Sequence, residues 1–120
     1  MEKDWKGSII AEGLSDPTIT NKFSIHGASI SKDDLPIDYK GNLGRWHGYE
    51  VSCSREEIDA LQQYISPGWY AHFWKGNRII VVFNDRQFEL DKNDEGTWKG
   101  AIEHGKKQGI PKKELDFPTE

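Results

Sequence analysis

The chain has 120 residues, of which 12% are aromatic, and a net charge of −4 at pH 7. This length fits a single domain, residues 1–120, and the aromatic content argues against intrinsic disorder. The acidic balance argues against nucleic-acid binding, because proteins that bind nucleic acids usually present a basic surface.

No segment approaches the roughly 18 apolar residues that a membrane span needs, so we expect no membrane partner. The first residues show no apolar stretch typical of a secretory signal. Cys53 is the single cysteine, which excludes an intrachain disulfide framework. We therefore expect a reduced, cytoplasmic protein.

The first third of the chain predicts short elements. An apolar run indicates a strand over 8–11, and the sequence Ser-Asp-Pro at 15–17 is typical of a helix start. This short helix should end near Phe23. Residues 32–44 are typical of a long loop. A strand over 23–30 should precede that loop and point its apolar side chains inward: Phe23, Ile25, Ala28 and Ile30.

Residues 46–53 alternate between apolar and polar side chains, which predicts a half-buried strand. Ser54 and Glu57 then form a capping box, in which the Ser54 hydroxyl accepts from the Glu57 N–H and the Glu57 carboxylate reaches back. The helix that begins there should end before Pro67. Its apolar stripe consists of Ile58, Leu61 and Ile65.

Three strands are predicted over 69–74, 78–83 and 86–90, because two short connections between them carry residues that suit tight turns. The middle segment is apolar on both faces, which predicts a central strand. A last helix should begin near residue 94 and end at Gly109, a residue type favoured after helix ends.

Together these elements predict an α+β fold. We expect an antiparallel sheet of four to six strands, including the three-strand meander of residues 69–90, packed against two or three helices. The two longer helices should lie on one face of the sheet.

The register of the first hairpin decides which face of the aromatic strand 69–74 is buried, because a slip of one residue exchanges the two faces. A three-residue turn over 75–77 buries Trp69 with Ala71 and Phe73. A two-residue turn, Gly76-Asn77, puts the alternate side chains in the core instead: Tyr70, His72 and Trp74. We favour the three-residue turn, because it separates polar from apolar side chains.

The favoured register leaves an amphipathic aromatic surface that includes Tyr70, His72, Trp74 and Arg78. Arg78 would lie opposite Trp74, in a cation–π contact worth about 0.5–1 kcal/mol. Such a surface suits a partner protein or a small molecule. Trp46 is a further candidate binding residue. The competing interpretation is that another segment covers this face and that His72 is a structural residue.

No catalytic residue is predicted. The four histidines lack paired metal spacing, so we expect no metal and no cofactor. Residues 91–96 resemble the start of a calcium loop, but Ile102 occupies the twelfth position, where such loops carry Glu. Cys53 precedes a helix start, which can lower a thiol pKa, but an inert core cysteine is the commoner case.

Two segments carry a resemblance: Gly-Trp-Tyr-Ala-His-Phe-Trp at 68–74, and Gly-Ile-Pro at 109–111 with Leu-Asp-Phe-Pro at 115–118. They resemble a group of small uncharacterised bacterial proteins. The resemblance implies a compact bacterial domain and no particular activity.

The function predicted from these features is a non-enzymatic binding or regulatory module that uses the aromatic sheet face. The alternative is a small hydrolase or isomerase with His72 as acid or base. The partner is an unknown protein or small molecule. We expect a monomer or a weak homodimer, which an exposed sheet edge would allow.

Overall fold

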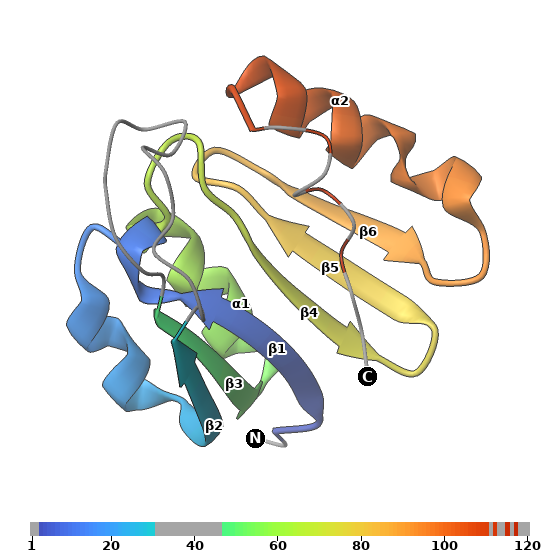
Figure 1. Ribbon diagram of the computed structural model, residues 1–120. Coiled ribbons are helices and arrows are strands. Elements are labelled where there is room, and N and C mark those ends of the chain that lie inside the picture. The colour runs from blue at the N-terminus through green and yellow to red at the C-terminus, as the bar shows by residue number, and fades with distance from the viewer. Residues whose placement is uncertain (1–2, 31–46, 111, 113–114, 116, 118–120) are drawn as a thin grey trace.

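The computed structural model describes residues 3–30, 47–110, 112, 115 and 117. Six antiparallel strands form one sheet in the order β2-β3-β1-β4-β5-β6 (Figure 1). The strands are β1 (Trp5–Ile10), β2 (Ser24–Ile30), β3 (His47–Cys53), β4 (Ala71–Lys75), β5 (Arg78–Val82) and β6 (Gln87–Asp91). The predicted α+β fold, with its meander β4-β5-β6, is confirmed.

Two α-helices and four 3-10 helices complete the described fold. The α-helices are α1 (Arg55–Leu61) and α2 (Lys99–Lys107), and the 3-10 helices are Ala11–Gly13, Pro17–Lys22, Gln62–Tyr64 and Glu95–Trp98. Within the described residues, no helix combines the length and apolar character needed to cross a membrane.

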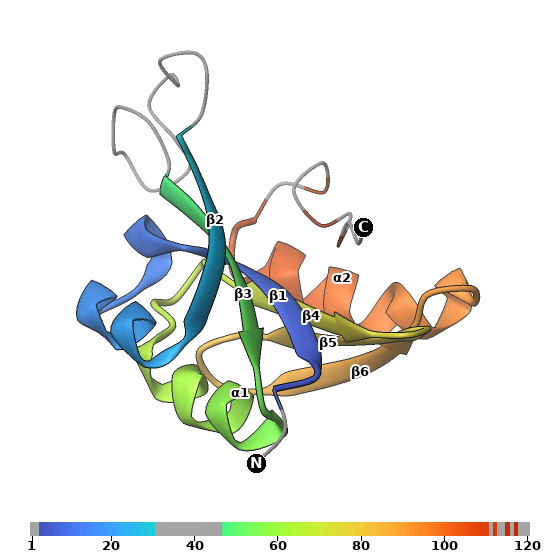
Figure 2. The same cartoon turned by 90° about the horizontal axis from the view of Figure 1, so that it is seen from below.

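The sheet carries a separate apolar core on each face. Ile58 and Leu61 of α1 pack on one face with Phe73 and Val82, whereas Ala101 of α2 belongs to the other core. Figures 1 and 2 show the two helices on opposite sides of the sheet. The expectation that both helices share one face is therefore wrong. Because β5 is buried on both faces, each face needs its own cover.

The first hairpin has the two-residue turn Gly76-Asn77, so the favoured three-residue turn is wrong. Trp74 lies opposite Ile79, and Phe73 opposite Ile80. Gly76 has φ +59°, which the first central position of a type II′ turn requires and glycine adopts without strain. This register places Tyr70, His72 and Trp74 on the face that α2 covers, which we call the α2 face.

The helix ends follow the predicted chemistry. Ser54 Oγ accepts from Glu57 N at 3.2 Å, and Glu57 Oε1 accepts from Ser54 N at 2.9 Å, which completes the capping box. At the end of α2, Gly109 has φ +88°. Ile110 N donates to Gly105 O at 3.0 Å, as in a Schellman motif.

The strand β2 forms one edge of the sheet, where it pairs with β3 alone among the described strands. Phe23, just before β2, is buried as predicted. Ile25 is 43% exposed and Ala28 is exposed, so the inward orientation predicted for these two side chains is wrong. An edge strand has a neighbour on one side only, which leaves its side chains less covered.

The C-terminal segment closes the core beneath α2. Leu115 and Phe117 are almost fully buried there. A Cβ atom at Gly105 would lie 2.6 Å from Leu115 Cδ2, so the glycine makes room for the leucine. The close approach of α2 to this segment therefore depends on a residue without a side chain.

We expect Gly105→Ala to lower the free energy of unfolding by about 1–3 kcal/mol, because the added methyl group overpacks against Leu115. This loss should exceed the gain from the higher helix propensity of alanine. The matched control is Gly100→Ala in the same helix, where a Cβ would meet only the edge of the Phe88 ring at 3.3 Å. In urea denaturation, the free energy of unfolding of Gly100→Ala should equal or exceed that of the parent protein. Equal effects at both positions would contradict this packing.

Candidate functional site

The predicted aromatic surface belongs to the core beneath α2. His72 is 6% exposed, and its ring centroid lies 5.3 Å from Trp74 and 6.5 Å from Phe117. Tyr70 meets Phe117 edge-on at 5.4 Å. Tyr70 and Trp74 are half-buried. The segment that covers this face comes from the C-terminal part of the chain, so its aromatic side chains are mainly structural.

The other predicted binding residues do not join this cluster. Arg78 lies on the opposite face, where its guanidinium stacks over the Trp5 ring at 5.1 Å and binds Glu89 at 2.9 Å. The predicted stacking of Arg78 on Trp74 is therefore wrong, because the two-residue turn sets Arg78 opposite Lys75. Trp46 lies outside the described residues.

A surface hollow of about 290 Å³ opens beside Arg78 and Glu89. Its lining also includes Asp91 and Thr97. The Arg78 and Glu89 charges neutralise each other, and Thr97 Oγ1 accepts from Asp91 N at 2.9 Å. The hollow therefore offers a ligand little unmatched positive charge.

We expect Trp74→Ala to lower the free energy of unfolding by about 1–3 kcal/mol, less than the 3–5 kcal/mol typical of fully buried aromatic residues, because Trp74 is half-buried. Trp74→Phe keeps an aromatic ring beside His72 and should lose less than half as much. Thermal or urea denaturation provides the measurement. A fully stable Trp74→Ala protein would place the ring outside the core.

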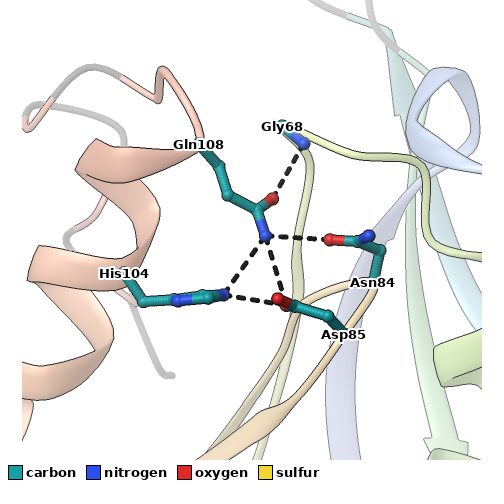
Figure 3. A network of polar contacts seen from close by, with 5 residues as sticks. All are labelled: Gly68, Asn84, Asp85, His104 and Gln108. Carbon is teal, nitrogen blue, oxygen red and sulfur yellow. Dashed lines mark hydrogen bonds and ion pairs between the residues drawn. The ribbon is translucent and has the colours of Figure 1, made fainter.

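A polar network joins α2 to the turn between β5 and β6. Its centre is Gln108, whose Oε1 accepts from Gly68 N at 2.9 Å and whose Nε2 donates to Asn84 Oδ1 at 2.8 Å (Figure 3). His104 Nε2 lies 2.8 Å from Asp85 Oδ1. His104 and Gln108 are four residues apart, so they lie on one side of the helix.

The protonation of this network follows from its geometry. Gly68 N can only donate, so Gln108 must turn its oxygen to Gly68 and its NH₂ group to Asn84 and Asp85. An ionised Asp85 can only accept, so His104 Nε2 carries a proton. The 3.2 Å approach of Gln108 Nε2 to His104 Nε2 is then a contact between two donors, not a hydrogen bond.

The His104 ring packs against two aromatic rings in addition to pairing with Asp85. Its ring meets Phe83 edge-on at 4.8 Å and lies 5.6 Å from Phe88, and its side chain is only 16% exposed. No hydroxyl, thiol or second carboxylate of a described residue hydrogen-bonds to it. The arrangement therefore orients a histidine beside a carboxylate without bringing a nucleophile to it, and its evident role is to join α2 to the hairpin.

The pKa of Asp85 is lowered by this network. Burial alone would raise the pKa of the carboxyl, but the hydrogen bond and the charge of His104 outweigh burial. A lowered folded-state pKa stabilises the protein above the unfolded-state pKa. This stabilisation disappears as the pH falls through the folded-state pKa.

We therefore expect the free energy of unfolding to fall below about pH 4, in part through Asp85, and Asp85→Asn to make that decline shallower. Denaturation curves recorded from pH 2 to pH 7 measure the effect. The control is Glu56→Gln, a substitution of an exposed carboxylate on α1. An identical acid profile for Asp85→Asn and the parent protein would contradict the pairing with His104.

A second polar area lies on the part of the α2 face that α2 itself does not cover. Ser8 of β1 lies opposite His72 of β4 and opposite Glu50 of β3, and Glu50 lies opposite Gly27 of β2. Directly opposite residues share a face, so this area continues the α2 face onto three strands that α2 does not cover (Figure 1). We call it the open half-sheet, and it consists of Lys6, Ser8, Ser24, His26, Glu50 and Ser52.

The side chains of the open half-sheet are partly organised. His26 Nε2 lies 2.6 Å from Ser52 Oγ. Glu50 lies over Gly27, where a Cβ atom would be 3.3 Å from Glu50 Oε2. His26, Glu50 and Lys6 are exposed, whereas the three serines are half-buried. The open half-sheet therefore presents hydrogen-bond donors and acceptors, one positive charge on Lys6 and one negative charge on Glu50.

Two further residues have clear roles. His47 binds Glu12, with Nδ1 2.6 Å from Oε2 and the backbone N 2.6 Å from Oε1. Cys53 is fully buried, and burial together with the charge of Glu57 raises the pKa of its thiol to about 12. Cys53 is thus an inert core residue at neutral pH.

The described residues contain no cluster of three or more histidine, cysteine, aspartate or glutamate side chains that could hold a metal ion. Asp94, in the segment that resembles a calcium loop, instead caps the 3-10 helix Glu95–Trp98, where its Oδ1 accepts from Gly96 N at 3.1 Å.

Sequence reasoning missed both the His104 network and the open half-sheet. The spacing of His104 and Gln108 on one helix is an available signal, but the sequence around their partners Asn84 and Asp85 indicates only a turn. Comparison of the chain with protein-family models, curated proteins and solved structures found no significant match. The resemblance to small bacterial proteins therefore stays a prediction.

Proposed function

We propose that this chain is a non-enzymatic binding module that recognises a partner protein through the open half-sheet. The observation that supports this proposal is the uneven cover of the sheet. At β4 and β5 both faces are buried, whereas at β1, β3 and β2 the α2 face carries exposed polar side chains.

The shape and chemistry of this surface favour a protein partner. Small-molecule sites are usually concave and largely apolar, whereas protein interfaces are broad and mix polar with apolar groups. The open half-sheet spans three adjacent strands and combines Lys6, Glu50 and the His26–Ser52 pair. A partner with complementary charges and hydrogen-bonding groups fits these residues.

The alternative, a hydrolase or isomerase with His72 as acid or base, has weaker support. His72 is 6% exposed and packs among Tyr70, Trp74 and Phe117. A general base must reach the proton that it abstracts, and this ring lies within a core. At the exposed pair His26–Ser52, no carboxylate of a described residue is hydrogen-bonded to the histidine.

The test begins with the partner bound to the protein in its own cells, identified by native mass spectrometry of the purified complex. The affinity of that partner is then measured for Glu50→Lys. We expect the dissociation constant to rise at least tenfold, about 1.4 kcal/mol, because the change reverses a charge at the centre of the surface.

The matched control is Glu103→Lys, which makes the same charge change at an exposed position on α2. It should leave the dissociation constant within about twofold. Ser52→Ala and His26→Ala should weaken binding without unfolding the protein. Full affinity in Glu50→Lys and both alanine variants would overturn the proposal.

A further inference from the structure

The two edges of the sheet differ in how they are protected. On β6, Asp91 N donates to Thr97 Oγ1 at 2.9 Å and Asp91 O accepts from Trp98 Nε1 at 2.8 Å, so the following 3-10 helix binds this edge. The same strand carries the charges of Glu89 and Asp91. Charges and covering elements are the usual means by which proteins keep sheet edges from pairing.

The edge at β2 has neither form of protection among the described residues. Its sequence, Ser-Ile-His-Gly-Ala-Ser-Ile, contains no Lys, Arg, Asp, Glu or Pro. Ile25 at this edge is the large apolar side chain most exposed in the described part of the chain. Unpaired backbone groups beside an exposed isoleucine favour the addition of another strand.

We propose that β2 pairs antiparallel with β2 of a second copy of this chain, so that two sheets join across a twofold axis. Charge supports this occupant. Each copy has a net charge of −4, and β2 brings no Lys, Arg, Asp or Glu side chain of its own to the contact. The nearest charges are of opposite sign, Lys3 beside Ser24 and Glu50 over Gly27, so two copies can approach here with little local repulsion.

A β-bulge at His26 sets the register in which the two β2 strands would pair. His26 is an extra residue, because Ile25 lies opposite Val51 while Gly27 lies opposite Glu50. Ile25 and Ala28 therefore face Val51 and Tyr49, which are two residues apart on β3. The bulge thus gives Ile25 and Ala28 the spacing of alternate residues in a regular strand.

If the twofold axis passes between His26 and Gly27, the residues that face each other across the two β2 strands are similar in character. Ile25 of one copy lies opposite Ala28 of the other on the apolar side. Ser24 lies opposite Ser29 on the polar side, and His26 lies opposite Gly27. The His26 ring is turned inward to Ser52 of β3 and Gly27 has no side chain, so neither residue blocks the edge. Cross-strand pairs of like character stabilise a sheet.

The contact is small, so the dimer is weak. A strand of seven residues buries less than the roughly 800 Å² per partner of a standard interface. Sedimentation velocity should show monomer at micromolar concentration and a growing fraction of dimer toward millimolar concentration. A strict monomer at millimolar concentration would overturn the proposal.

Two lysine variants locate the contact. Ile25→Lys puts a charge on the β2 edge and should abolish the dimer, whereas Ala60→Lys, at an exposed position of α1, should leave it unchanged. A dimer that survives Ile25→Lys would place the contact elsewhere. Lys6→Glu changes the open half-sheet on β1, two strands from the β2 edge, and should not affect dimerisation, which separates this proposal from partner binding by the open half-sheet.

A cysteine pair tests the register. In Ile25→Cys/Ala28→Cys, directly opposite Cα atoms should be about 4.5–5.5 Å apart, within disulfide reach. Mild oxidation should give a covalent dimer of the double variant, while each single variant stays mainly monomeric. Cys53 is buried and should not compete. Equal cross-linking of the single and double variants would contradict this register.

Discussion

The central strand β5 constrains the whole architecture, because it is apolar on both sides. Ile79 and Val81 point to the α2 core, and Ile80 and Val82 to the α1 core, and all four are fully buried. Burial of a large aliphatic side chain contributes about 1.5–3 kcal/mol, so neither face can remain in water without a large loss of stability. Helices on both sides of the sheet follow from this one strand.

Attachment of α2 depends on polar as well as apolar contacts. Gln108 binds Gly68 and Asn84, and His104 binds Asp85, so one end of the helix is joined to two loops. These contacts fix the position of α2 over β4, β5 and β6 and away from β1, β3 and β2. The extent of the open half-sheet is thus a consequence of where α2 is anchored.

Local chemistry made much of the fold predictable, and long-range packing accounts for the errors. The capping box at Ser54 and the helix end at Gly109 depend on neighbouring residues, and both are confirmed. The register at Gly76 does not follow from the hydrophobic pattern, because both alternations of the aromatic strand are packed in cores, one on each face. The open half-sheet combines residues from β1, β2 and β3, whose pairing no local pattern reveals.

The two cores differ in when the growing chain can complete them. The core under α1 uses buried residues from Trp5 to Val82, whereas the core under α2 also needs Ile110, Leu115 and Phe117. During synthesis the α1 side can close while the ribosome still holds the last helix. The side chains of Tyr70, His72 and Trp74 then stay exposed to solvent until residue 117 has left the ribosome.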